Sequence, residues 1–239
     1  MTNNKIALIT GANKGIGFAC ARQLGKMGYT VLIGARDESR GKEAAGTLKS
    51  EGIDAVPVIL DITRQDTMNS TLRFIENEYG RLDVLVNNAG IFLEKGILPS
   101  KLDLQDLKAT FEVNFFGIFS LTMALLPLLR DSAAGRIVQV SSGQGSLTRA
   151  SGNDSGRLQL AYNCSKAALN MMTIQLAKEF AGTPLKINSA APGYTMTDMN
   201  EGKGSRTVDE AAEVIVRLAT LDDNGSSGGY FEDVGEVPW

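Results

Sequence analysis

Two side chains that could move a proton lie four residues apart, in the segment Tyr162-Asn163-Cys164-Ser165-Lys166. Four residues make about one turn of a helix, so the Tyr162 phenol and the Lys166 ammonium would face the same side. A phenol with its ordinary pKa of about 10 is a poor acid–base catalyst at neutral pH, but a neighbouring cation lowers that pKa. The pair predicts acid–base chemistry, although the same spacing also arises by chance with a surface lysine.

A second segment could bind phosphate, because Thr10-Gly11-Ala12-Asn13-Lys14-Gly15-Ile16-Gly17 lies where a short apolar strand is expected to pass into a helix. Glycine lets the backbone approach an anion closely, and the first turn of a helix presents free N–H groups. The spacing G-x-x-x-G-x-G differs from the commoner G-x-G-x-x-G, and glycines also serve ordinary turns. Its position at a strand-to-helix junction favours a dinucleotide site.

The residues after the second expected strand favour NADP over NAD. Arg36 and Arg40, together with Lys14, could form a cationic pocket, because guanidinium groups match the oxygens of a 2′-phosphate. Two other interpretations stay open: the arginines are solvated surface charges, or Asp37 binds the ribose. We interpret Asp37 as the N-cap of the helix that follows it.

The elements that must position these residues alternate along the chain, with short β-branched runs between segments of helical period. Strands are expected at 5–10, 31–33, 55–59, 82–86, 137–140, near 187 and at 230–231. Helices are expected at 15–28, 40–50, 65–79, 104–111, 115–129 and 161–180, with a last one opening at a Thr207–Glu210 capping box. The pattern predicts one domain over 1–239: a Rossmann-type, doubly wound parallel α/β sheet of about seven strands with helices on both faces.

The composition excludes several classes of protein. There is no histidine, so a Ser-His-Asp triad, a Cys-His pair and a His-ligated zinc are impossible, and no metal is expected. A net charge of −3 without a basic patch argues against nucleic-acid and membrane partners. Cys20 and Cys164 are expected to be buried free thiols. With no signal peptide and no long apolar run, we expect a soluble, cytoplasmic protein.

In their order along nearly the whole chain, the motifs resemble those of the short-chain dehydrogenase/reductase family, and most of all its NADPH-dependent carbonyl reductases. The finer likeness rests on the segments GARDESRG, LDVLVNNAGI and VPW. The motifs of the family are the glycine-rich segment, Asp61, Asn87-Asn88-Ala89-Gly90, Asn114, Ser142, Tyr162 with Lys166, and Pro192-Gly193 leading to Thr197.

The resemblance implies a catalytic role for four residues. Tyr162 would protonate the carbonyl oxygen as hydride arrives from the nicotinamide, and Ser142 would hydrogen-bond the same oxygen. Lys166 would hold the nicotinamide ribose and lower the pKa of Tyr162, and Asn114 would help to hold a water that links Lys166 to solvent. Without the family, Ser142 would be interpreted as a cap and Asn114 as a satisfied polar residue of a helix interface.

The resemblance also implies NADPH/NADP+ as the cofactor. Asp61 would accept from the adenine amino group, unless it only caps the next helix. Asn88 and Gly90 would line the adenine ribose, and Thr197 and the backbone near Thr195 would hold the carboxamide. The predicted cofactor residues are Gly11, Asn13, Lys14, Gly15, Ile16, Gly17, Arg36, Arg40, Asp61, Ile62, Asn88, Ala89, Gly90, Tyr162, Lys166, Pro192, Gly193, Thr195 and Thr197.

Two loops should shape the substrate cleft. Tyr162 follows Ser142 by 20 positions, more than is usual in the family, which predicts a loop insertion at 143–160. A short lid is expected at 194–206. A largely apolar lining predicts a small-molecule ketone, aldehyde or quinone as substrate. The predicted substrate residues are Phe92, Gly143, Gln144, Leu147, Tyr194, Met196 and Met199.

Several alternatives stay open. The chain could work as an alcohol, steroid or sugar dehydrogenase, or as a 3-oxoacyl-thioester reductase whose cationic rim is Lys203 and Arg206. It could also be a non-catalytic NADP(H) sensor, because fold does not fix function. The insertion bears on assembly, so a homodimer, a homotetramer and a monomer are all considered.

Overall fold

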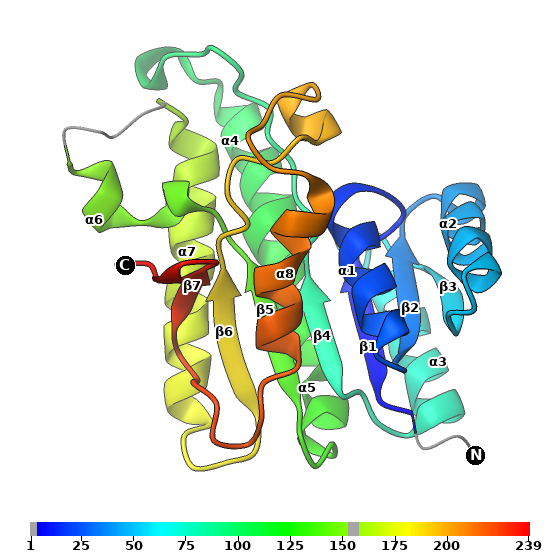
Figure 1. Ribbon diagram of the computed structural model, residues 1–239. Helices are drawn as coiled ribbons and strands as arrows, with labels where there is room; N and C mark the ends of the chain where they lie inside the picture. Colours follow the sequence, from blue (N-terminus) through cyan, green and yellow to red (C-terminus); the bar gives the residue numbers. More distant parts are fainter. Residues whose placement is uncertain (1–3, 153–157) are drawn as a thin grey trace.

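All eight strands of the computed structural model form one sheet, in the order β3-β2-β1-β4-β5-β6-β7-β8 (Figure 1). The structure describes residues 4–152 and 158–239. Neighbouring strands are parallel except for the antiparallel pair β7 and β8. The strands are β1 (Ile6–Thr10), β2 (Thr30–Ala35), β3 (Ala55–Ile59), β4 (Val84–Asn87), β5 (Arg136–Val140), β6 (Lys186–Ala190), β7 (Tyr230–Glu232) and β8 (Gly235–Glu236).

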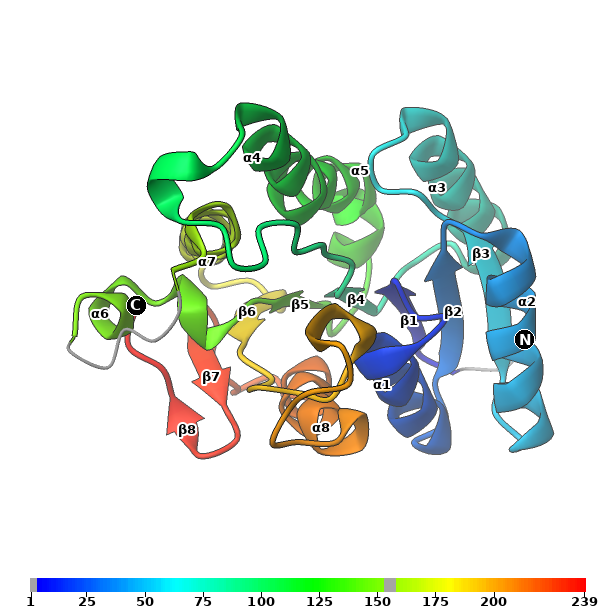
Figure 2. The ribbon, with the colours of Figure 1, turned by 90° about the horizontal axis from the view of Figure 1, so that it is seen from above.

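Helices cover both faces of the sheet, as Figure 2 shows. One face carries α1 (Gly15–Lys26), α2 (Glu38–Ser50) and α8 (Val208–Ala219), and the other carries α3 (Gln65–Tyr79), α4 (Leu104–Phe111), α5 (Ile118–Arg130) and α7 (Leu160–Glu179). Every residue of β1, β2, β4 and β5 is buried, because central parallel strands are covered on both sides. Two hydrophobic cores result, one on each face. The predicted doubly wound architecture is confirmed.

The helix that was predicted in two pieces is one continuous run from Leu104 to Arg130. A π-helical segment, η2 (Glu112–Gly117), joins α4 to α5. A π turn contains one more residue than an α turn, so it shifts the spacing of the apolar residues. The shift makes the sequence resemble two separate helices. Gly117 is required there, because a Cβ on it would lie 2.4 Å from the carbonyl oxygen of Ile62.

The eighth strand was not predicted, since the two residues of β8 are too few to show an alternating pattern. The predicted insertion at 143–160 contains two short helices, η3 (Gly143–Gly145) and α6 (Leu147–Ala150), while residues 153–157 lie outside the described part of the chain. Two more short turns are η1 (Pro99–Lys101) and η4 (Asp198–Asn200). The capping box of α8 is confirmed: Thr207 N donates to Glu210 Oε2 over 2.7 Å, and Glu210 N donates to Thr207 Oγ1 over 3.2 Å.

One helix, the continuous run Leu104–Arg130, is long and apolar enough to cross a membrane by length and composition alone. In the fold its α5 part packs on β4 and α3, where Leu121 and Leu125 are fully buried, as in the core helix of a globular domain. The expectation for the cysteines is half correct: Cys20 is buried, but Cys164 points outward from α7 and is exposed.

Candidate active site

The strand order determines where the site residues gather. Strands β1 and β4 are parallel neighbours, so the loops that follow them start at the same edge of the sheet. From there the chain continues toward β2 on one side and toward β5 on the other. Such a topological switch point forms a crevice at the carboxyl ends of the strands, where α/β proteins bind their ligands. The glycine-rich loop follows β1, and the segment Asn88-Ala89-Gly90 follows β4.

The glycine-rich loop depends on residues without a side chain. Gly11 and Gly15 have φ values of +63° and +61°, which favour glycine. A Cβ on Gly17 would lie 2.5 Å from Asn88 Nδ2 and 2.8 Å from the carbonyl oxygen of Gly11. Helix α1 begins at Gly15, and its N-cap residue Lys14 makes no side-chain cap hydrogen bond. The first turn of α1 therefore presents backbone N–H groups, together with a close-approach surface that fits a pyrophosphate.

The loops after β1 and β4 are tied to each other. Thr10 Oγ1 accepts from the N–H groups of Asn88 and Ala89, both over 2.9 Å. Asn88 Nδ2 donates to the carbonyl oxygens of Thr10 (2.8 Å) and Gly11 (3.3 Å). The side chain of Asn88 thus supports the glycine-rich loop, and its contact with a ribose stays a prediction.

The cations predicted to bind a 2′-phosphate are exposed, and two of them share a carboxylate. Lys14 forms an ion pair with Asp198 of η4, and Lys14 first and then Arg40 hold the pKa of Asp198 below its ordinary value. The charges of Lys14 and Arg40 therefore act on the same carboxylate, that of Asp198. Arg36 lies exposed directly after β2. Asp37 is the N-cap of α2, as interpreted from the sequence, because its Oδ1 accepts from Arg40 N over 2.9 Å.

Asp61 and Ile62 follow β3. Asp61 Oδ1 accepts from the backbone N (3.0 Å) and the hydroxyl (2.7 Å) of Thr63, so this carboxylate closes a turn. The N-cap position of α3 belongs to Arg64, which removes the simple capping alternative for Asp61. Ile62 is buried, and its contact with a cofactor stays a prediction. The adenine contact of Asp61 stays a prediction.

The three predicted reacting residues come together where β5 ends and α7 begins. The Ser142 hydroxyl lies close enough to the Tyr162 phenol to lower its pKa. The Lys166 ammonium lies 5.7 Å from the centroid of the Tyr162 ring, and Phe92 packs edge-on against the same ring at 5.5 Å. The one-turn spacing of Tyr162 and Lys166 on α7 thus places both at one point, as expected.

The electrostatics of the pair differ from the expectation. Burial raises the pKa of the Tyr162 phenol, and the nearby Ser142 hydroxyl opposes that rise. Lys166 is 4% exposed, and burial lowers its pKa to about 8. Its Nζ donates to the carbonyl oxygen of Val140 over 2.7 Å, so the ammonium is directed at the end of β5. Desolvation of the phenol therefore acts against the predicted lowering of its pKa by Lys166, and that lowering stays a prediction.

Asn114 is fully buried in the π-helical segment η2. Its Oδ1 accepts from Ile91 N (2.8 Å), and its Nδ2 donates to Ile91 O (3.0 Å) and Ser165 Oγ (3.1 Å). A Cβ on Gly90 would lie 3.3 Å from Asn114 Oδ1 and 3.7 Å from Lys166 Nζ. Asn114 thus connects the loop after β4 with α7 beside Lys166, and its water-holding role stays a prediction.

The two ends of the segment 194–206, the predicted lid, are hydrogen-bonded to each other, and the segment lies beside the glycine-rich loop. Met196 N donates to Arg206 O, and Ser205 N donates to Tyr194 O, each over 2.9 Å. A Cβ on Gly15 would lie 4.0 Å from Thr197 Cγ2, so loop and lid stand close together. The buried Pro192 and Thr195 and the exposed Gly193 lead into this lid.

The predicted substrate residues lie on three segments. Phe92 contacts the Tyr162 ring, and Gly143 and Gln144 belong to η3 directly after Ser142. Gln144 N donates to Ser142 Oγ over 3.2 Å, so Ser142 is also the cap that its sequence suggested. The predicted lid carries Tyr194, Met196 and Met199. Leu147 is 71% exposed on α6, a helix that lies beside the C-terminal end in Figure 2, and its contact with a substrate stays a prediction.

Comparison with known proteins identifies the family. A family model described as short chain dehydrogenase matches residues 5–207. The chain belongs to the short-chain dehydrogenase family. It is 34% identical to carbonyl reductase [NADPH] 3 of Rattus norvegicus, over 91% of each chain, and 33% identical to salutaridine reductase of Papaver bracteatum, over 99% of this chain and 96% of that one. As a member, it is an oxidoreductase that acts on CH–OH or C=O groups.

Solved structures agree with the assignment. Salutaridine reductase of Papaver somniferum superimposes with a TM-score of 0.85 at 30% identity, covering 96% of this chain and all of that one. A short-chain dehydrogenase of Escherichia coli CFT073 complexed with NADPH superimposes with a TM-score of 0.86 at 30% identity, covering 96% of each chain. These similarities, together with the glycine-rich loop at the start of α1, indicate a nicotinamide-dependent enzyme.

Two further residues of this short-chain dehydrogenase touch the site and were missed from the sequence. The Tyr230 hydroxyl, on β7, donates to the carbonyl oxygen of Ser142, and the Tyr230 ring stacks on Trp239 at 5.2 Å. Glu94, after β4, is buried and binds backbone groups at the start of α7. Neither has a local signal, because each reaches a residue more than 60 positions away in the chain.

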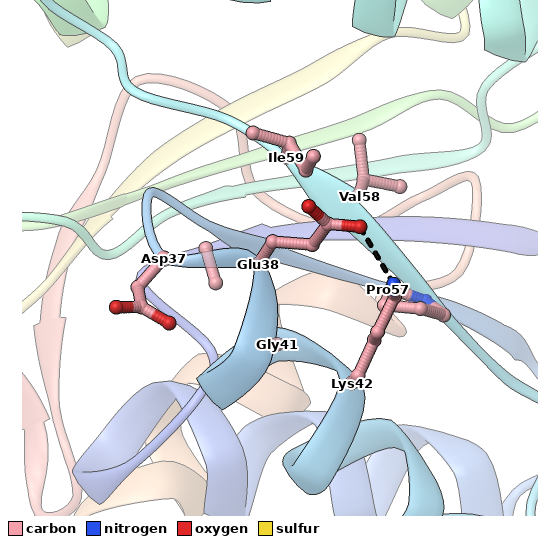
Figure 3. A pocket seen from close by; sticks show the side chains of 8 residues that line it. Asp37, Glu38, Gly41, Lys42, Pro57, Val58 and Ile59 are labelled. Carbon is pink, nitrogen blue, oxygen red and sulfur yellow. Dashed lines mark ion pairs between the residues drawn. The ribbon is translucent and has the colours of Figure 1, made fainter.

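One hollow of this short-chain dehydrogenase lies apart from the catalytic residues. It has a volume of about 130 Å³ and lies between the start of α2 and strand β3 (Figure 3). Glu38 and Lys42 form an ion pair over 2.6 Å in its wall. Its lining is Ala35, Asp37, Glu38, Gly41, Lys42, Pro57, Val58 and Ile59. None of these is a predicted site residue, and we assign the hollow no role.

Proposed function

We propose that this protein is an NADPH-dependent carbonyl reductase that reduces a ketone, aldehyde or quinone. The observation that carries the proposal is the Tyr162 phenol beside the Ser142 hydroxyl at the carboxyl edge of the sheet, with the Lys166 ammonium 5.7 Å from the centroid of its ring. Retention of all three groups argues against a sensor that only binds a dinucleotide. The rat relative named as an NADPH carbonyl reductase supports the same reaction.

Residues of this chain fit a dinucleotide. The first turn of α1 would bind the pyrophosphate, and Lys14, Arg36 and Arg40 would bind a 2′-phosphate, which favours NADPH. Gly90 would line the adenine ribose together with Asn88, and a Cβ there would lie 3.3 Å from Asn114 Oδ1. When bound, the cofactor supplies hydride to the carbonyl carbon.

The protein's own groups deal with the carbonyl oxygen. Tyr162 donates its phenolic proton to that oxygen as negative charge develops on it, and Ser142 stabilises the charge by a hydrogen bond from its hydroxyl. The Lys166 ammonium holds the ribose and stabilises the phenolate that remains. Because burial raises the pKa of Tyr162, the phenol carries its proton at neutral pH, which favours the reducing direction.

The apolar side chains at the cleft favour a hydrophobic small molecule. Phe92, Met196 and Met199 would contact its substituents, with 194–206 as the lid. We propose a single cytoplasmic catalytic domain over 1–239. A homodimer or homotetramer, with the monomer as the alternative, stays a prediction.

The test is cofactor oxidation, followed by the nicotinamide absorbance, with aryl ketones, α-diketones, quinones, aldehydes, an acetoacetyl thioester and a keto-steroid. We expect turnover with NADPH in the wild type. Tyr162→Phe should lose turnover by a factor of about 10² or more, while its Kd for NADPH stays within a few-fold. Substantial activity of Tyr162→Phe would remove the proton-transfer role. Tight NADPH binding without turnover of any compound, in either direction, would favour the sensor.

A further inference from the structure

A buried carboxylate caps the helix that carries the reacting pair. Glu94, in the loop after β4, is 2% exposed, which is rare for a glutamate. Its Oε2 accepts from Ala161 N over 3.0 Å, and its Oε1 accepts from Tyr162 N over 2.6 Å. Both N–H groups belong to the first turn of α7, where a helix has no partners of its own for them. Each carboxylate oxygen of Glu94 thus satisfies one orphan donor.

Within the described residues 4–152 and 158–239, no other side chain caps α7 at this end. Its N-cap residue, Gln159, makes no side-chain cap hydrogen bond. A negative charge at this end also interacts favourably with the helix dipole. The orientation of the first turn of α7 therefore depends on a residue 68 positions away from Tyr162.

The residues beside Glu94 contact the same tyrosine or its supports. Phe92 packs against the Tyr162 ring with 5.5 Å between centroids. Ile91 is fixed at both its N–H and its carbonyl by Asn114. The segment 91–94 therefore contacts Tyr162 from two sides, at the ring through Phe92 and at the backbone through Glu94, and is itself fixed to η2.

We propose that Glu94 is a positioning residue for Tyr162: it holds the first turn of α7 so that the phenol meets Ser142 and the substrate oxygen. The inference rests on the proposed function, in which Tyr162 is the general acid. Hydrogen bonds to a charged group contribute about 1.5–3 kcal/mol each, which corresponds to about tenfold to a hundredfold in an equilibrium or a rate.

The kinetic test compares Glu94→Gln with Glu76→Gln. Glutamine keeps the size of Glu94 but presents an amide NH2 to one of the two N–H groups. We expect kcat for carbonyl reduction to fall about tenfold to a hundredfold, with the Kd for NADPH within about twofold. Glu76 is the matched control, because it is exposed on α3, which carries no predicted site residue, so the same change of charge in Glu76→Gln should keep the wild-type kcat. Glu94→Asp, which retains the charge but is shorter, should be intermediate.

The pH profile separates positioning from general destabilisation. In the oxidising direction the rate rises with pH as the Tyr162 phenol loses its proton. The Ser142 hydroxyl lowers the pKa of that phenol, so a phenol displaced from Ser142 in Glu94→Gln should shift the rise to higher pH. A variant that is only less stable would keep the wild-type profile. A shift to lower pH would show that the carboxylate acts through its charge alone, and either of these two results would overturn the proposal.

Hydrogen exchange tests the cap without any turnover. Peptides that cover 158–166 should exchange at least about tenfold faster in Glu94→Gln than in the wild type, while peptides from the glycine-rich loop stay unchanged. If the wild type reduces no carbonyl but the exchange changes as expected, the proposed function fails and the cap at Tyr162 stands. If wild-type reduction is normal and Glu94→Gln matches the wild type in exchange and kcat, only the role of Glu94 is overturned.

Discussion

At the scale of single residues, the site holds a cation in an unusual setting. Lys166 is almost fully buried on α7, and its ammonium donates to the carbonyl oxygen of Val140. Desolvation disfavours the charged form and lowers its pKa from an ordinary 10.5 to about 8. The charge that should hold the cofactor ribose and stabilise the phenolate is therefore present at neutral pH and is lost in mildly alkaline solution.

A pH dependence follows from the sign of this shift. As the pH rises through about 8, Lys166 releases its proton in the free enzyme. We expect kcat/KM for NADPH to be level below that pH and to fall above it, because kcat/KM reports the ionisation of the free enzyme. Initial rates measured over about pH 6–10 test this. The range ends at about 10 because ordinary lysine side chains begin to titrate there. Lys166→Arg, which keeps its charge over this range, should lack the alkaline fall, and a wild-type profile that stays flat would contradict the assignment.

At the scale of elements, the last hairpin holds the segment after Ser142. Arg149 of α6 forms two hydrogen bonds to the Glu232 carboxylate of β7, over 3.0 and 2.7 Å. Ser146 Oγ donates to Pro238 O over 2.5 Å, and Tyr230 donates to Ser142 O. The hairpin thus supports the backbone of Ser142, the predicted catalytic serine.

Removal of the phenolic hydroxyl of Tyr230 should therefore remove one support of the Ser142 backbone. Tyr230→Phe leaves the half-buried Ser142 carbonyl without this donor, which should cost about 1 kcal/mol in the free energy of unfolding. We expect a lower Tm and a several-fold fall in kcat, with the Kd for NADPH unchanged. Thermal unfolding and steady-state rates measure both effects. Tyr79→Phe is the control, because α3 carries no site residue, and equal behaviour of the two variants would disprove the support role.

At the scale of the whole molecule, a dinucleotide would contact segments that follow β1, β2, β3, β4 and β6. Those segments come from both halves of the sheet, which meet between β1 and β4. A ligand that binds only the folded chain stabilises it by mass action. NADPH should therefore stabilise the cooperative unit as a whole rather than one loop.

The expected size of that effect is measurable by calorimetry. NADPH at about 100 times its Kd should add about 2.7 kcal/mol to the free energy of unfolding. For a chain of this size that corresponds to a Tm increase of roughly 5–10 °C. At the same concentration, NADH should give a smaller increase. In Arg36→Ala with Arg40→Ala, the increase with NADPH should drop to that with NADH; an undiminished difference would show that these arginines do not recognise the 2′-phosphate.

The sequence by itself determined the architecture and led to the prediction of the reacting groups. Periodicity marks β-branched strands and amphipathic helices because both depend on neighbours a few residues apart, so Gln65–Tyr79 and Ala55–Ile59 were predicted with their correct bounds. The motifs around Tyr162, Lys166 and the glycine-rich loop were found for the same local reason.

Only the tertiary structure decided what depends on contacts distant in sequence. The capping of α7 by Glu94 and the support of Ser142 by Tyr230 each join residues far apart along the chain, which no local pattern encodes. The same holds for the raised pKa of Tyr162, since burial is set by the packing of several elements. The spacing of Tyr162 and Lys166 places two groups on one face of a helix, but it does not state how much water surrounds them, and that exclusion of water sets the energy of their charges.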